Sequence, residues 1–323
     1  MASAYDFVSN LSPAQICQVF YVLSAAAVLA VAAVPDRAQQ LLTQYGARSS
    51  EATILPASTL GHQDVGQDRQ DSNAGYLFRL VSCLTAVGKI PHAWFIHFYI
   101  ISLSCTVFWA VQFITHGTVL ALIVENQCSK HTSSSMTLSQ VVLVWFLMGL
   151  QGARRLYEYL AVLRPSSSRM WIIHWLLGNA FYLCTSISIW VEGSRSIRCF
   201  SEDCPSIQFL PLKSVIASLV FLIAWFMQYQ CHRYLAGLKK YSLPEDGLFR
   251  YLVCPHYTCE CLLYLSLATI AAPEGQLYNR TLACAVLFVS VNLGVTANGT
   301  KLWYDERFGS QVRGKWKMIP VVF

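Results

Sequence analysis

The chain has 323 residues and few charges: 23 Lys and Arg and 17 Asp and Glu together make 12% of it, while apolar residues make 55%. Soluble domains carry about 25% charged residues, and the mean hydropathy here is +0.44. So few charges cannot solvate a globular surface, which excludes a water-soluble enzyme, a nucleic-acid binder, a coiled coil and a disordered scaffold. The remaining class is an integral membrane protein.

Seven apolar runs are long enough to cross a bilayer, which takes about 20 helical residues. They are Gln15–Val34, Ala93–Thr115, Leu138–Leu163, Trp171–Val191, Leu212–Gln230, Leu252–Ala272 and Tyr278–Ala297. Lipid offers backbone groups no hydrogen-bond partner, so we predict an all-α integral membrane protein, a bundle of seven transmembrane helices forming one domain over 1–323. A cleaved leader is the alternative for the first run, although no basic stretch precedes it.

The segments between these runs are polar or short. Residues 35–75 read as a long polar loop, followed by a short interfacial helix near Tyr76–Val87. The run Gly117–Val124 is too short to cross alone and is expected to re-enter or lie at the interface. Residues 298–323 read as a basic tail.

Basic residues are unequally divided between the two sides of the predicted bundle. Thirteen follow spans three, five and seven: Arg154, Arg155, Arg164, Arg169, Arg233, Lys239, Lys240, Arg250, Lys301, Arg307, Arg313, Lys315 and Lys317. Five follow spans two, four and six: Lys130, Arg195, Arg198, Lys213 and Arg280. Positive charge marks the cytosolic side, so we expect a lumenal N-terminus and a cytosolic C-terminus. Cys199 and Cys204 then share a lumenal loop, where a disulfide could persist.

Ionisable side chains gather in three stretches on the predicted cytosolic side: QGARRLYEYL (151–160), MQYQCHRYLAGLKKY (227–241) and CPHYTCE (254–260). In the third stretch His256 and Glu260 are four residues apart and share one helix face. Each stretch alone is also typical of a snorkelling helix end or an aromatic belt. Their convergence with the basic tail indicates a site for an anionic cytosolic ligand, because Arg and Lys bind phosphates through charge-assisted hydrogen bonds.

The stretch CPHYTCEC offers thiolate and imidazole groups that would suit zinc. Structural zinc sites usually combine a CxxC knuckle with a second, distant pair of ligands. We therefore interpret Cys254, His256, Cys259 and Cys261 as part of a packed helix. No metal and no nucleic acid is expected as a partner, and the sequence leaves the oligomeric state open.

Six stretches in the same order resemble the steroid 5α-reductase family, in its polyprenol reductase branch. They are PHAWFIHFYIIS (91–102), QGARRLYEYL, HWLLGNAFYL (174–183), QYQCHRYLAGLKK (228–240), PHYTCECLLYLSLA (255–268) and WYDERF with KWKMIP in the tail. The resemblance implies a seven-helix reductase of the endoplasmic reticulum that binds NADPH in a cytosol-facing cavity and reduces a carbon–carbon double bond of a lipid. In this branch the product is dolichol for protein N-glycosylation.

The resemblance also implies a set of cofactor-binding residues. They are Arg155, Gln228, His232, Lys239, Tyr241, His256, Glu260 and Tyr304. Two departures from the family pattern bear on the site. Lys301 stands where family members often have His, and Phe98 follows His97 where the steroid branch carries a carboxylate. The missing carboxylate argues against a steroid ketone as substrate and leaves His97 and Tyr99 as polar groups beside the lipid.

Chemistry narrows the lipid further. Hydride adds readily to a double bond conjugated with a polarised carbonyl, and a hydrogen-bond donor to that oxygen stabilises the developing charge. Polyprenal has that carbonyl, whereas polyprenol is the nominal substrate only when coupled oxidoreductases are present. His97, Tyr99 and Tyr257 are the candidate donors. A steroid 5α-reductase, a long-chain enoyl-CoA reductase and a non-enzymatic seven-helix receptor are the alternatives.

Overall fold

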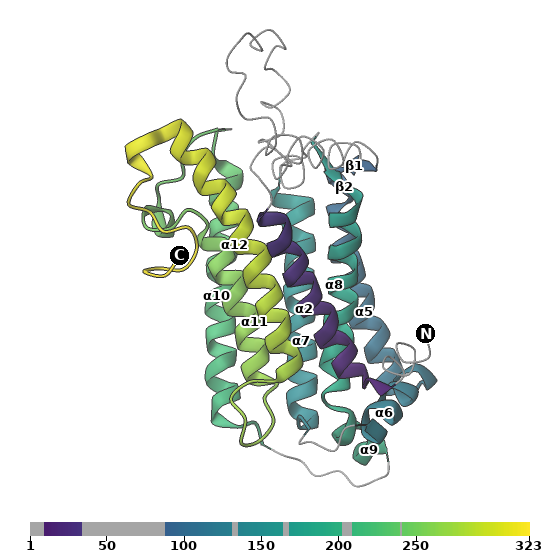
Figure 1. Ribbon diagram of the computed structural model, residues 1–323. Helices are drawn as coiled ribbons and strands as arrows, with labels where there is room; N and C mark the ends of the chain where they lie inside the picture. Colours follow the sequence, from purple (N-terminus) through teal and green to yellow (C-terminus); the bar gives the residue numbers. More distant parts are fainter. Residues whose placement is uncertain (1–9, 34–87, 131–134, 164–167, 202–208, 240) are drawn as a thin grey trace, which may run out of the picture.

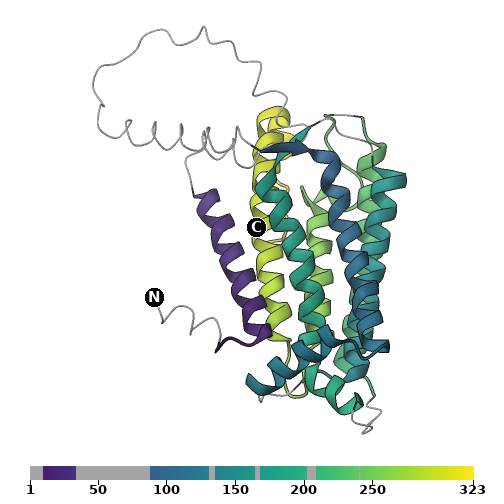
Figure 2. The same cartoon turned by 90° about the vertical axis from the view of Figure 1, so that its right-hand side faces the viewer.

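The computed structural model describes residues 10–33, 88–130, 135–163, 168–201, 209–239 and 241–323. In these ranges seven long helices run side by side as one bundle (Figures 1 and 2). They are α2 Pro13–Ala32, α5 Ile96–Ile114, α7 Leu138–Tyr157, α8 Ile172–Val191, α10 Leu212–Gly237, α11 Pro255–Ile270 and α12 Arg280–Phe308. Successive long helices alternate in direction, so every second connection lies at the same end of the bundle.

The helical membrane class predicted from the sequence is confirmed. Five segments of the described residues are long and apolar enough to cross a membrane. They are Pro13–Ala32, His92–Ile114, Ile172–Val191, Leu212–Gly237 and Arg280–Gln311. The predicted number of seven spans is not established by helix length and hydropathy, because α11 has only 16 residues and the last turn of α7 carries Arg154 and Arg155.

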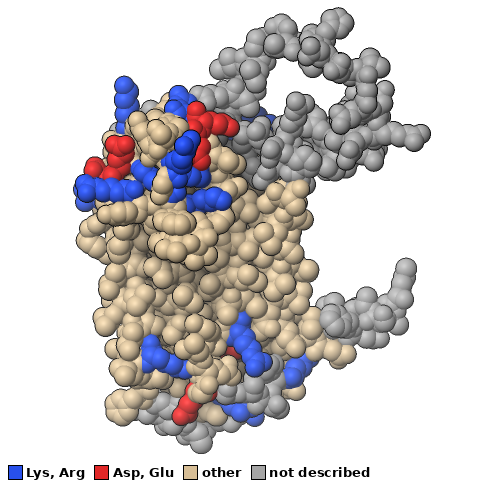
Figure 3. Space-filling model, turned by 60° about the vertical axis from the view of Figure 1, so that its left-hand side comes forward, with Lys and Arg blue, Asp and Glu red and all other residues tan. Residues whose placement is uncertain are grey.

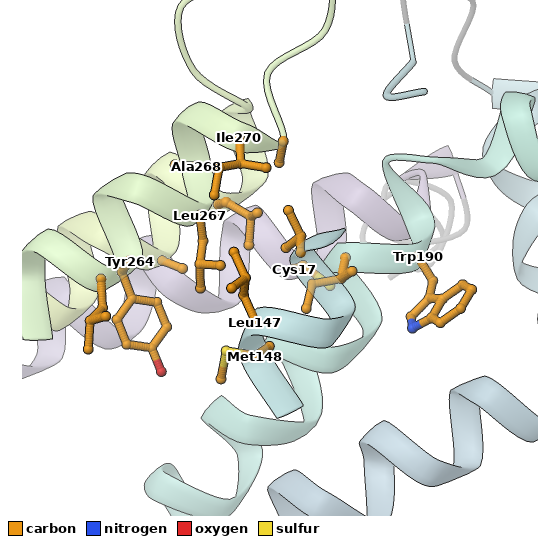
Figure 4. Packing of buried hydrophobic residues seen from close by; sticks show 14 of the residues in the cluster. Cys17, Leu147, Met148, Trp190, Tyr264, Leu267, Ala268 and Ile270 are labelled. Atoms are coloured by element: carbon orange, nitrogen blue, oxygen red, sulfur yellow. The ribbon is translucent and has the colours of Figure 1, made fainter. Parts of the chain in front are cut away.

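Apolar side chains both fill the bundle and cover its outside. Figure 4 shows Cys17, Leu147, Leu267 and other residues of α2, α7, α8 and α11 packed against one another in the core. Many large apolar side chains point outward instead, for example Leu23 on α2, which is 64% exposed. Figure 3 shows the result on one face, an uncharged band between two charged ends, as a lipid-facing surface requires.

Short elements close the two ends of the bundle. At one end the strands β1 Lys89–Pro91 and β2 Arg169–Trp171 pair antiparallel, with Ile90 opposite Met170. This pairing ties together the chain just before α5 and α8. At the other end lie α6 Thr118–Lys130 and α9 Ser194–Ser201, which contact each other (Figure 1). The run expected to re-enter or lie at the interface is thus part of α6.

Local sequence sets several helix boundaries. Ser12 and Thr137 are N-caps whose side chains form reciprocal hydrogen bonds with Gln15 and Gln140, which fixes the starts of α2 and α7. Asn279 accepts from Leu282 N and begins α12. Single turns complete the fold: η3 His92–Phe95, the π-turn η4 Glu158–Val162, η5 Gly247–Arg250 and η6 Gly309–Gln311.

Some sequence expectations fall outside the described residues. The polar loop 35–75, the interfacial helix near Tyr76–Val87 and Cys204 of the expected disulfide all lie there. The seventh apolar run ends at Ala297, but α12 continues to Phe308. The first part of the expected basic tail is therefore helical.

Candidate active site

The polar stretches found in the sequence meet at the end of the bundle that carries β1 and β2. This end holds the starts of α5, α8 and α11 and the ends of α2, α7, α10 and α12 (Figure 1). Figure 3 shows Lys and Arg gathered there beside Asp and Glu. We call it the basic end.

The centre of the site is the carboxylate of Glu158, which follows α7 and is fully buried. Its Oε1 lies 2.7 Å from Arg154 Nη1, and its Oε2 pairs with Arg155 Nη1. The Nδ1 atom of His232 on α10 lies 2.7 Å from the same Oε2. One carboxylate thus compensates two guanidinium groups that are largely shielded from solvent, as buried charges require.

A second carboxylate extends this network toward α11. Glu260 Oε2 accepts from Gln151 Nε2 at 3.3 Å and also from Gln228 Nε2. Arg154 donates to Gln151 Oε1 at 2.7 Å and to Gln228 Oε1. Because Gln151 and Gln228 join the two carboxylates, side chains from α7, α10 and α11 form one connected polar network.

The structure separates His97 from Tyr99, although both are on α5. The Tyr99 hydroxyl accepts from Arg155 Nη2 at 2.9 Å, and the Arg155 guanidinium lies 5.2 Å from the centre of the Tyr99 ring. His97 points elsewhere: its Nδ1 accepts from Trp175 Nε1 at 3.1 Å, and Trp94 packs against its ring. Of the two, Tyr99 belongs to the polar network.

His256 lies at the edge of the network, in the first turn of α11. Its ring packs 5.6 Å from that of His232 and 4.3 Å from that of Tyr257, measured between centroids. Its backbone oxygen accepts from Gln228 Nε2 at 3.1 Å. Its Nδ1 is buried and has no hydrogen-bond partner among the described residues, and the same holds for Nε of Arg154.

The other residues of the implied cofactor set lie farther along the basic end. The Arg307 guanidinium lies 5.1 Å from the ring centre of Tyr241 and 5.3 Å from that of Trp303. Tyr304 packs against Trp303 at 5.2 Å. Lys239 stands after the end of α10 and is exposed. These residues form an aromatic and cationic group on α12 and the chain after α10.

Several residues of the network have no role that the sequence alone assigned. Arg154 and Glu158 stood in the first polar stretch without an assigned role, and Gln151 lay in the same stretch. A pattern in the sequence could have identified these residues: polar side chains three or four positions apart at the end of an apolar run lie on the same face of a helix.

The stretch CPHYTCEC forms the start of α11 and packs as a helix. In the part of the chain that the structure describes, no three His, Cys, Asp or Glu side chains are placed to share a metal ion. The Cys261 thiol is instead a hydrogen-bond partner of Ser290.

Comparison with known proteins identifies the family to which the chain belongs. A family model described as 3-oxo-5-alpha-steroid 4-dehydrogenase matches residues 169–323. An uncharacterized protein of Schizosaccharomyces pombe is 30% identical over 242 residues, which covers 73% of this chain and 79% of that protein. The chain belongs to the steroid 5α-reductase family.

Named relatives agree with this family. A "Polyprenal reductase" of Caenorhabditis elegans is 27% identical over 281 residues, covering 76% of this chain and 89% of that protein. A "Polyprenal reductase" of Saccharomyces cerevisiae is 32% identical over 181 residues, covering 56% of this chain and 64% of that protein. The family and these relatives indicate an oxidoreductase, and the helices described above place it in a membrane as a multi-pass protein.

Proposed function

We propose that the chain reduces the α-isoprene double bond of a polyprenoid lipid, with polyprenal as the reacting species and NADPH as the reductant. The buried polar network around Glu158 carries this proposal, because it concentrates Arg, His and Gln side chains at the basic end of an otherwise apolar bundle. The names of the relatives support the substrate class. The proposal extends to the endoplasmic reticulum membrane, a lumenal N-terminus and a cytosolic C-terminus, where the product supplies dolichol for N-glycosylation.

The donor atoms of the basic end fit a dinucleotide. The buried Arg154 Nε and His256 Nδ1 have no hydrogen-bond partner among the described residues, and polar atoms in that state are costly unless a ligand or water meets them. The cationic and aromatic group of Tyr241, Tyr304 and Arg307 offers further contacts for phosphate and a flat ring. When bound, NADPH supplies the hydride; the protein supplies binding and orientation.

The cofactor set proposed on this basis is the one implied by the resemblance. It comprises Arg155, Gln228, His232, Lys239, Tyr241, His256, Glu260 and Tyr304. Arg155 and His232 are both held by Glu158, so that carboxylate orients two members of the set. Glu260 and Gln228 are held by each other.

Tyr99 is the best placed of the three candidate donors to the lipid carbonyl. Its phenolic oxygen accepts from Arg155, so its own O–H remains to donate to another oxygen. The adjacent guanidinium strengthens that donation by polarising the hydroxyl. A carbonyl held by Tyr99 would accept charge as the double bond is reduced, which is the role of an oxyanion donor. His97, bonded to Trp175, and Tyr257, packed on His256, are the alternatives.

The test uses purified protein in lipid nanodiscs with NADPH and, separately, polyprenal, polyprenol, a steroid 3-ketone and a long-chain enoyl-CoA. We expect rapid reduction of polyprenal alone. Turnover of pure polyprenol as fast as that of polyprenal would show that the substrate needs no carbonyl. Preference for the steroid 3-ketone would favour a steroid 5α-reductase, and preference for the thioester would favour an enoyl-CoA reductase. Binding of NADPH to the folded state should raise the thermal stability. No such stabilisation would favour the non-enzymatic alternative, a seven-helix receptor.

The role of Tyr99 is tested by Tyr99→Phe, with His97→Phe as the matched control on the same helix. Loss of one oxyanion donor costs about 100-fold to 1,000-fold in kcat. We expect a loss of that order in Tyr99→Phe with little change in the NADPH-induced thermal shift, and a smaller loss in His97→Phe. The reverse order would transfer the role to His97.

A further inference from the structure

The last residues of the chain fold back along the bundle. In Figures 1 and 2 the C-terminus lies well below the upper end of α12, at a level that the long helices also occupy. Three backbone hydrogen bonds hold this segment to the chain before α11. Val253 N donates to Trp316 O at 2.8 Å, Cys254 N donates to Lys317 O at 3.0 Å, and Trp316 N donates to Tyr251 O at 2.9 Å. Lys315–Phe323 is therefore a defined part of the fold.

The tip of this segment exposes apolar side chains only. Val321 is 78% exposed, Val322 is 77% exposed and Ile319 is 38% exposed, and Pro320 between them has no N–H. Such a tip facing water would be costly, since burial of apolar surface gains about 25 cal/mol per Å². Acyl chains surround membrane-spanning helices and would offer such a tip an apolar environment.

Several backbone groups of the tip are paired within the segment. Met318 N and Ile319 N both donate to Phe323 O at 3.0 Å, and Phe323 N donates to Ile319 O at 2.9 Å. Val322 N also donates to Ile319 O, at 3.2 Å. Unpaired backbone groups are costly in the hydrocarbon core, so these bonds lower the cost of placing the turn at the shallow side of the acyl chains, near the headgroups.

The residues before the tip are typical of a membrane interface. Trp316 is 43% exposed and Tyr251, whose carbonyl accepts from Trp316 N, is 68% exposed. The Lys317 ammonium lies 4.1 Å from the centre of the Phe323 ring. Lys315 donates to Pro244 O at 3.0 Å, and burial lowers its pKa. Aromatic rings and long basic side chains gather at the boundary between acyl chains and headgroups.

We propose that Lys315–Phe323 is an interfacial anchor: its apolar tip, Ile319–Val322, inserts among the acyl chains of the leaflet at the basic end, and its basic residues face the lipid headgroups. Because Trp316 and Lys317 are bonded to the residues before α11, the anchor also fixes the height of His256 relative to the membrane surface. The partner is the bilayer itself, so this inference holds whatever the chain reduces.

The experiment compares two added tryptophans in nanodiscs made with phospholipid brominated on the acyl carbons nearest the headgroup. Val322→Trp puts the probe on the tip, and Ser310→Trp puts it on an exposed residue at the end of α12. The fluorescence of the unsubstituted protein is subtracted from both. Insertion of the tip to about 5–10 Å predicts that bromine removes about half of the signal added at Val322, and almost none of that added at Ser310.

Equal, weak quenching at both positions would overturn the proposal. A copy of the chain or a soluble protein covering the tip would give the same weak quenching together with cross-links from a photoreactive residue at Val322 to protein. If Val322→Trp fails to fold, Val321→Trp repeats the measurement on the neighbouring exposed position. Since no substrate or NADPH is present, failure here leaves the proposed activity untouched.

Discussion

Replacing Glu158 with Gln should destabilise the protein strongly, because it removes a carboxylate that two guanidinium groups share. The Glu158 side chain is 0% exposed, and those of Arg154 and Arg155 are 3% and 19% exposed. Gln keeps the length of the side chain and can still accept one hydrogen bond, but it leaves net positive charge in a shielded site. Removing one partner of a buried ion pair costs about 3–5 kcal/mol of folding free energy.

The matched control is Asp305→Asn on α12. Asp305 Oδ1 lies 3.2 Å from Lys301 Nζ, the spacing is again i to i+4, and Asp305 is 39% exposed. Exposed pairs of this kind contribute about 0–1 kcal/mol. Both variants exchange a carboxylate for an amide, so the difference between them reports burial.

The assay is equilibrium unfolding in mixed micelles, with the mole fraction of denaturing detergent increased and helix content followed by circular dichroism. A difference of about 3 kcal/mol corresponds to roughly 100-fold in the unfolding equilibrium constant. If Glu158→Gln loses no more stability than Asp305→Asn, then the carboxylate does not compensate the two Arg residues, and the argument for a charged network at the site fails.

Two further predictions use the same preparations. His256→Phe keeps an aromatic ring but removes Nδ1, which has no partner among the described residues. The larger ring should cost about 1–3 kcal/mol of unfolding free energy without NADPH, and the NADPH-induced thermal shift should shrink as well; an unchanged shift would remove His256 from the cofactor set. Gly178→Ala places a Cβ 2.7 Å from the Phe98 ring and should cost about 1–3 kcal/mol of unfolding free energy. Gly237→Ala has no atom within 4 Å of the new Cβ, so it should lose no unfolding free energy through overpacking. Equal losses of unfolding free energy in the two variants would show that the contact with Phe98 is not the cause.

The apolar runs predicted where helices lie better than where they end. Trp171–Val191 differs from α8 by one residue, because both the apolar run and the helix end before Glu192, which is the C-cap residue. The run ending at Gln230 misses the last turns of α10, which continue to Gly237. Hydropathy depends on which side chains contact lipid, whereas a helix extends as far as its backbone hydrogen bonds continue. A helix can therefore extend beyond the apolar run. His232 interrupts the run but turns inward to Glu158.

The site was predictable in part from where polar residues occur relative to the apolar runs. Charged residues are costly inside apolar runs, which identified Arg155, His232 and Glu260. The sequence could not show that Glu158 joins them, since that depends on which face of the helix points inward. It could not separate His97 from Tyr99 either. Residues two apart on a helix point in nearly opposite directions, and the partners of the two side chains, Arg155 for Tyr99 and Trp175 for His97, show which one faces the network.

The order of residues around Glu158 also has a consequence for how the chain enters the membrane. Gln228, a partner of Arg154, and His232, a partner of Arg155, are synthesised more than 70 residues later. Glu158 follows the two Arg residues by four and three positions, so it can pair with them as soon as that turn of helix forms. One short stretch of chain thus carries the two cations together with one counter-ion, so part of its charge is compensated before the later helices are synthesised.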